Sequence, residues 1–257
     1  WGGGGGLFLT VSPAPPGGGA PACAAITSLA GRMRDLLGHL GDELAEHTPV
    51  EKAAARLHEA RRLDNDIAGV DAALRQAEDS LRLNPRVKEG LLFRLVLRTG
   101  LDTLEICAVV LRVCCRTLTD LARTRTDGPL FHDRLAEALR ELFTHMASAV
   151  ENFAVLITAQ ISASAEEAEV RLTQELAAAR VSRERAARLL EEEARARPGT
   201  WQLYGALLAE VDRVLDELGV EKRSERLVEE LDRHSRAQRV RRPWLSRLWR
   251  ERPPADQ

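Results

Sequence analysis

The chain has 257 residues, of which 44% are hydrophobic, 30% are charged and only 4% are aromatic, and its formal net charge is −2. More than half of the residues are Ala, Leu, Arg, Glu or Lys, a composition typical of long amphipathic helices and coiled coils. A β-sandwich or β-barrel is excluded, because its strands would need far more β-branched and aromatic residues.

Residues 1–21 form a Gly/Pro-rich leader. The chain lacks an initiator Met, so we expect it to be a fragment, and we interpret Leu7–Val11 as the end of an apolar membrane helix upstream. The glycines and prolines equally favour the alternative, a leader without regular structure. We find no signal peptide, and the sequence has no uninterrupted stretch of about 20 apolar residues that would span a bilayer.

From residue 22 onward, apolar residues recur every three or four positions, which is the period of an amphipathic helix. Prolines, glycines and capping residues interrupt this pattern and delimit the elements. The sequence predicts helices over about 22–46, 49–84, 87–123, 135–157, 164–197, 201–218 and 224–240.

Three local patterns refine this prediction. Capping boxes are predicted at Thr48–Glu51 and Ser164–Glu167, and Thr200 is predicted to cap the sixth helix. The apolar residues between Leu57 and Leu81 have nearly the spacing of a coiled-coil seam. The segment Leu91–Leu97 is apolar on nearly all sides, so we expect it to be the most buried part of the chain.

These elements predict an all-α fold, an antiparallel bundle of six or seven long, coiled-coil-like helices. We divide the chain into the leader at 1–21, a helical bundle at 22–240 that subdivides near 125–130, and a basic Trp/Arg tail at 241–257. Several helices joined by short breaks pack most simply against their neighbours in alternating directions, and this favours the bundle.

The four cysteines, Cys23, Cys107, Cys114 and Cys115, form no C-x-x-C pair. In a helix rich in Leu and Ala they are interpreted as small buried thiols rather than as metal ligands or disulfide partners. A reducing, cytoplasmic environment fits this interpretation.

No catalytic pattern is present. Glu137, Glu141 and His145 share one helix face, but a metal site needs further ligands from other helices, so a solvated face is the favoured interpretation. The runs Glu191–Glu193 and Glu229–Glu230 are interpreted as exposed charges. The sequence contains neither a phosphate-binding loop nor a nucleophile motif. We therefore expect a protein that is not an enzyme and has no cofactor or metal.

Positive charge gathers in residues 233–257, which carry eight arginines against Glu251 and Asp256, whereas the preceding residues are net acidic. Arginines alternate there with tryptophans and leucines, a combination that favours contact with anionic lipid headgroups. The alternatives are a tail that is solvated or packed on the bundle, and contact with nucleic acid, which the acidic body disfavours. The predicted membrane-surface residues are Arg239, Arg241, Arg242, Trp244, Leu245, Arg247, Leu248, Trp249 and Arg250.

Two segments resemble the cytoplasmic region of actinobacterial FUSC-family proteins, the fusaric acid resistance and aromatic acid exporter group. The first is Ala77–Arg86, which reads AEDSLRLNPR, and the second runs from Leu97–Glu105, LRTGLDTLE, to Leu118–Leu121. Upstream, Leu9–Pro16 resembles the point at which the last membrane helix of that family enters the cytoplasm. The similarity covers roughly residues 7–123.

The resemblance implies that this chain is the cytoplasmic helical portion of a membrane protein that exports aromatic acids or confers resistance to them. We expect it at the cytoplasmic face of the cell membrane, where it contacts the anionic inner leaflet and an upstream transmembrane region. We also expect it to form a homo-oligomer and to have an assembly or gating role, without binding nucleic acid. The alternative is a soluble coiled-coil scaffold or interaction protein unrelated to transport.

Overall fold

The computed structural model describes residues 19–44, 46, 50–82, 88–125, 128–159 and 162–241. These ranges contain seven α-helices and no strand. The helices are α1 (Gly19–Leu44), α2 (Val50–Arg82), α3 (Lys88–Thr124), α4 (Asp133–Thr158), α5 (Ser162–Ala196), α6 (Trp201–Leu218) and α7 (Val220–Arg241). A short 3₁₀ turn at Pro198–Thr200 precedes α6.

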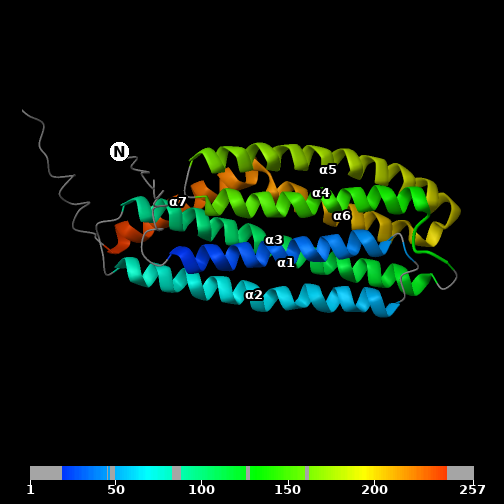
Figure 1. Ribbon diagram of the computed structural model, residues 1–257, viewed down its shortest axis with the longest axis horizontal. Coiled ribbons are helices and arrows are strands. Elements are labelled where there is room, and N and C mark those ends of the chain that lie inside the picture. Colours follow the sequence, from blue (N-terminus) through cyan, green and yellow to red (C-terminus); the bar gives the residue numbers. More distant parts are fainter. Residues whose placement is uncertain are drawn as a thin grey trace, which may run out of the picture.

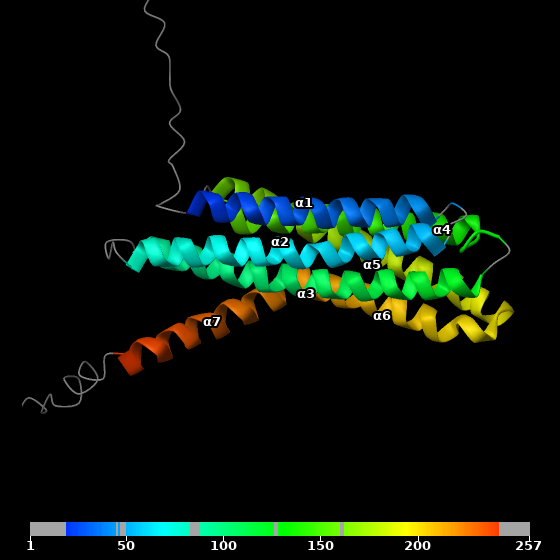
Figure 2. The ribbon, with the colours of Figure 1, turned by 90° about the horizontal axis from the view of Figure 1, so that it is seen from below.

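Helices α1 to α6 lie along a common long axis and alternate in direction (Figure 1). Helix α1 packs between α2 and α4, α3 packs on α2, α5 packs on α4, and α6 closes the ring by contacting α3 and α5. Helix α7 continues in the direction of α6 and diverges from the other helices toward its C-terminal end (Figure 2). The predicted all-α antiparallel bundle is therefore confirmed.

The core is a cluster of buried apolar side chains from α1 to α6. The stripe predicted on the fourth helix is buried in full, which shows how well an apolar period of 3.6 locates the core face. Its members are Leu135, Leu139, Leu142, Phe143, Met146, Val150, Phe153 and Ile157. The described part of the seam predicted on α2 is also largely buried, with Leu57 and Ile67 only partly covered, whereas the side chain of Leu81 lies outside what the structure describes.

Glycines allow α4 to approach two other helices closely. A Cβ at Gly41 of α1 would lie 3.5 Å from the Cβ of Phe143, which is an ordinary contact. A Cβ at Gly100 of α3 would overlap the Cδ1 of Ile157. A side chain at position 100 would therefore force Ile157 to shift.

The segment Leu91–Leu97 is not the most buried part of the chain, contrary to the prediction. Leu95 and Leu97 are buried, but Leu92 is 53% exposed and Leu91, Phe93 and Val96 are only partly covered. The start of α3 has α2 on one side, and α7 has already diverged from the bundle on the other (Figure 2). A helix that is apolar on all sides is buried only if neighbours surround it, and here they do not.

Several predicted helix starts were displaced. Helix α1 begins at Gly19, inside the expected leader, and α5 begins at Ser162, so Ser164 lies inside the helix and cannot cap it. The Thr200 side chain makes no capping bond to α6, because its hydroxyl donates to the carbonyl of Arg197 at 2.8 Å. The predicted cap residues Thr48 and Pro49, and the segment 83–87, lie outside the described residues.

The buried thiols were correctly predicted for three of the four cysteines. Cys107, Cys114 and Cys115 are buried and Cys23 is half-buried, and all four are free. Burial raises the pKa of Cys107 and of Cys115 to about 12 and also raises the pKa of Cys114. The reactive thiolate is therefore strongly disfavoured at these positions.

Glu210 of α6 faces Thr117 of α3 across the seam between these helices. The Thr117 hydroxyl donates to Oε1 of Glu210 at 2.8 Å, whereas Oε2 is buried without a hydrogen-bond partner among the described residues. Burial raises the pKa of the Glu210 carboxyl, and the Thr117 hydrogen bond opposes this shift.

Glu210→Gln is expected to raise the free energy of unfolding near pH 7 by up to about 1 kcal/mol, because the amide keeps the Thr117 contact without a desolvated charge. Because the pKa of Glu210 is raised in the folded state, the cost of burying its negative charge is full at neutral pH. This cost shrinks as the pH falls through the folded-state pKa and disappears below the unfolded-state pKa. Urea unfolding should therefore show a smaller gain near pH 4. The exposed control Glu166→Gln should show no such change; an equal gain at both pH values would contradict the prediction.

Candidate functional site

Helix α7 is the element on which the predicted functional residues begin. It follows α6 across Gly219, whose backbone is extended (φ −68°, ψ 157°) and whose N–H donates to the carbonyl of Asp216 at 3.2 Å. Helix α7 continues in the direction of α6 after this residue (Figure 2). None of the residues of α7 is fully buried, and the helix packs on α3 and α6.

A buried carboxylate anchors the first half of α7. The side chain of Glu217 is only 3% exposed and accepts hydrogen bonds from Arg213 at 2.9 Å and from Arg226 of α7. Arg226 also donates to the hydroxyl of Thr103 on α3 at 2.5 Å. These contacts join α6, α7 and α3, because a buried carboxylate needs charged partners to offset its desolvation.

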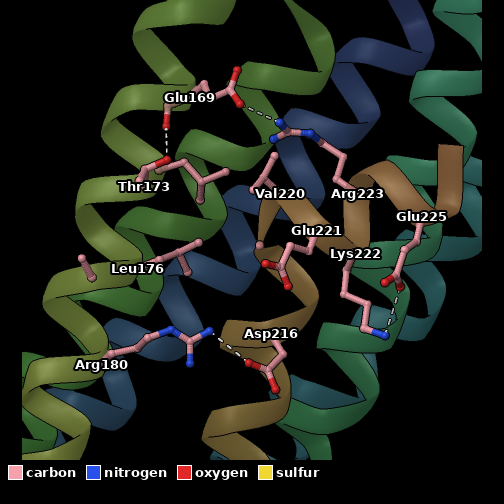
Figure 3. A pocket seen from close by; sticks show the side chains of 13 residues that line it. Glu169, Thr173, Leu176, Arg180, Asp216, Val220, Glu221, Lys222, Arg223 and Glu225 are labelled. Atoms are coloured by element: carbon pink, nitrogen blue, oxygen red, sulfur yellow. Dashed lines mark hydrogen bonds and ion pairs between the residues drawn. The ribbon is translucent and has the colours of Figure 1, made fainter.

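A groove of about 610 Å³ lies where α7 meets α5 and α6 (Figure 3). Ion pairs line it: Arg223 contacts Glu169 at 2.9 Å, Arg180 contacts Asp216 at 3.0 Å, and Lys222 contacts Glu225 at 3.3 Å. The first two pairs cross the groove from helix to helix. They fasten α7 and α6 to α5, and each cation at the groove already has a carboxylate partner.

A second cleft, of about 440 Å³, separates the outer half of α7 from α2 and α3, and its lining includes Arg94, Arg98 and His234. The neighbouring Asp102 of α3 is partly buried. Burial raises the pKa of the Asp102 carboxyl, Arg98 opposes the shift, and Glu230 of α7 adds to it. Charges of both signs therefore meet along the seam between α3 and α7.

The outer half of α7 carries an exposed basic surface. Arg233, Arg236, Arg239 and Arg241 are all exposed, and residues 233–241 contain no acidic residue. Arg233 contacts Glu230 one turn earlier. We call these four arginines the basic end of α7; cations are favoured there because the helix dipole is negative at its C-terminus.

The structure places two of the nine predicted membrane-surface residues. Arg239 and Arg241 lie in the last turn of α7 and point into solvent-exposed surroundings. The other seven, Arg242, Trp244, Leu245, Arg247, Leu248, Trp249 and Arg250, lie outside the described residues. The sequence pattern located this basic surface because its arginines are not interrupted by acidic residues.

Helix α1 begins and helix α7 ends toward the same end of the long axis (Figures 1 and 2). Helix α6 ends before it reaches the end of the bundle at which α1 begins, and α7 completes the return and extends past that end (Figure 2). None of the helices in the described ranges is both long and hydrophobic enough to cross a lipid bilayer.

On the predicted face of α4, His145 and Glu141 contact α5, whereas Glu137 is exposed. His145 Nδ1 lies 2.7 Å from Glu175, and Glu141 accepts a hydrogen bond from Arg185 at 3.3 Å. Across the described part of the chain, no group of three or more potential metal ligands comes together. His145 and Glu141 therefore join α4 to α5. The sequence of α4 alone does not reveal this contact.

Two buried acids were missed by the sequence analysis. Glu193, taken as an exposed charge, has a side chain only 5% exposed and contacts Arg125 at 3.1 Å, and Glu217 is the anchor of α7. Glu193 follows Ala179, Ala186 and Leu190 on the buried stripe of α5. Counting alanines as core residues would have found this stripe, whereas the larger apolar residue Val170 on the same helix is 56% exposed.

Comparison of the chain with protein-family models, with curated proteins and with solved structures finds no match.

Proposed function

We propose that this chain is the non-catalytic cytoplasmic domain of a membrane transport protein of the FUSC, or aromatic acid exporter, type, with an assembly or gating role. In this proposal the bundle stands on the anionic inner leaflet, which it contacts through the basic end of α7 and the Trp/Arg segment that follows. One observation carries the proposal: the chain enters the bundle at Gly19 and leaves it through the basic end of α7 at the same end of the long axis.

This placement suits a domain attached to a bilayer. A membrane segment preceding α1 and a membrane-contacting segment following α7 would reach the same surface without crossing the length of the bundle. Each arginine near an anionic surface contributes about 1 kcal/mol of binding free energy. The net acidic remainder of the chain is repelled by the same surface and favours this orientation.

Vesicle co-sedimentation tests the lipid contact. The chain should bind vesicles rich in phosphatidylglycerol more tightly than vesicles of phosphatidylcholine, and added salt should weaken this binding. Replacing Arg233, Arg236, Arg239 and Arg241 with Gln should reduce binding to anionic vesicles at least about tenfold, because roughly 1 kcal/mol is lost per arginine.

The matched control replaces four other exposed arginines, Arg61, Arg62, Arg134 and Arg188, with Gln, which gives the same change in net charge. This control should bind anionic vesicles nearly as well as the unaltered chain. Equal binding to neutral and anionic vesicles, or equal losses in the two variants, would contradict the proposal.

A coiled-coil scaffold without a transport role is the second candidate, which the buried seam of α2 against α1 and α3 favours. The coding sequence upstream of residue 1 separates the two candidates. Several hydrophobic spans in frame would support the transport protein, whereas a nearby start codon with no such span would support the scaffold.

A further inference from the structure

A cavity of about 160 Å³ lies where α7 crosses α3 and α4. Its lining is mainly apolar and includes Val96 of α3, Phe153 of α4 and Leu227 of α7. Apolar cavities of about 150 Å³ admit a benzene ring. The exposed Ser224 of α7 also lines the cavity and offers a hydroxyl acceptor at its mouth. The cavity therefore suits an aromatic ring with one N–H donor, which is the chemistry of an indole side chain.

Exposed apolar side chains extend this cavity along α3 and α7. Leu92 lies one helical turn before Val96 and is 53% exposed, and Leu231 lies one turn after Leu227 and is 39% exposed. Because α3 and α7 run in opposite directions, both leucines lie toward the C-terminal end of α7 (Figure 2). We call the cavity together with Leu92 and Leu231 the apolar patch of α7. Uncovered apolar surface beside an apolar cavity favours a bound partner.

Exposed acids accompany the patch along the first half of α7. They are Glu221, Glu225, Glu229 and Asp232. The cations of this half, Lys222, Arg223 and Arg226, each contact a carboxylate already. The surroundings of the patch therefore favour an occupant that is both apolar and positively charged.

The chain itself supplies such an occupant beyond Arg241, the last described residue, because Trp249 follows a leucine and precedes Arg250. From Leu227 to Arg241, α7 rises about 21 Å, at about 1.5 Å per residue. The eight residues from Arg241 to Trp249 span up to about 26 Å when extended, whereas the three to Trp244 span only about 10 Å. Trp249 can therefore return to the cavity, and Trp244 cannot.

We propose that Trp249 occupies the cavity between α3, α4 and α7 when no lipid is present, with its indole N–H on the hydroxyl of Ser224 and its neighbouring arginines beside the acids of α7. This inference rests on the proposed function, in which the same segment contacts anionic lipid. Trp249 cannot occupy the cavity and the bilayer together. The apolar patch therefore competes with lipid, and it holds the Trp/Arg segment until an anionic surface displaces it.

Tryptophan fluorescence without lipid tests the docking. Two variants of the full chain each keep a single tryptophan, Trp249 or Trp244, with Phe at the other three tryptophan positions. Trp249 should emit at a shorter wavelength than Trp244 and be quenched several times less by acrylamide, because only Trp249 reaches the cavity. Dilution should not change this protection, since both partners belong to one chain. Equal quenching of the two tryptophans would overturn the proposal, as would protection lost on dilution, which indicates a second copy.

Filling the cavity should release Trp249. In the chain that keeps only Trp249, Ser224→Phe should raise acrylamide quenching to the level of Trp244, and Val96→Phe should do the same from α3. Ser235→Phe is the matched control, because Ser235 is exposed on the same helix but does not line the cavity. Equal protection of Trp249 in all three variants would rule out this cavity as its site. If a filling variant alters the thermal melting curve, the comparison of Trp249 with Trp244 decides.

Vesicle binding tests the competition. We expect the docked form to outnumber the free form about tenfold, so Ser224→Phe should strengthen binding to phosphatidylglycerol vesicles by about that factor and Ser235→Phe should not. Equal affinities of the two variants would contradict the competition. If no variant binds vesicles, the proposed function and the competition both fail, whereas the fluorescence of Trp249 without lipid still decides the docking.

Discussion

Glu193→Ala is expected to lower the free energy of unfolding by about 3–5 kcal/mol, because it leaves a buried arginine without its counterion. The Glu193 and Arg125 side chains are only 5% and 9% exposed, and Nη1 of Arg125 lies 3.1 Å from Oε1 of Glu193. Arg125 also donates to the carbonyl of Leu130, so the pair fastens the connection between α3 and α4 onto α5. Urea unfolding followed by circular dichroism measures the loss.

Glu191→Ala is the matched control. Glu191 lies on the same helix and pairs with Arg195 at 2.6 Å, but both side chains are mostly exposed, so the loss should stay within about 0.5 kcal/mol. Arg125→Met combined with Glu193→Leu should be less destabilising than Glu193→Ala alone, because no unpaired charge remains. A loss in Glu193→Ala no greater than in Glu191→Ala would contradict the buried pair.

Phe143→Ala is expected to lower the free energy of unfolding by about 3–5 kcal/mol, through lost apolar burial and the cavity that remains. Phe143 has no exposed surface and lies in α4 opposite Gly41 of α1. Because α4 packs on both α1 and α5, the cavity would open in the middle of the bundle. Urea unfolding followed by circular dichroism at several wavelengths would measure the loss of unfolding free energy.

Val155→Ala provides the comparison on the same helix. Val155 is 45% exposed, so its truncation should change the unfolding free energy by no more than about 0.5 kcal/mol. Similar losses at the two positions would show that α4 is oriented differently in the bundle.

The helices could be predicted because their apolar residues repeat with the period of the helix. The stripe from Leu135 to Ile157 is the clearest case, since each of its predicted members is buried. Periodicity fails where the core face is built from small residues. On α5 the buried positions include Ala168, Ala179 and Ala186, so the stripe looks weak and Glu193 looks like one more exposed charge.

The candidate site could be predicted only in part, because local sequence and distant contacts contribute different pieces. The basic end of α7 is visible as arginines without acidic neighbours. The groove beside Arg223 depends on α5, α6 and α7, whose lining residues are far apart in the chain, so no local sequence pattern predicts it. The same holds for Glu217, because its partner Arg226 lies on α7 and also donates a hydrogen bond to Thr103 of α3.

Sequence alone determined that this protein is a bundle of long helices with a positive C-terminal region, because helix propensity, apolar period and net charge are local properties. Only the tertiary structure decided at which end of the bundle the basic end of α7 lies. The break at Gly219 is equally compatible with a reversal and with a change of angle, since one residue does not encode the direction of the next helix. The contacts of Arg226 with Glu217 and Thr103 fix α7 in the direction in which α6 runs. This direction brings the basic end of α7 to the end of the bundle at which α1 begins.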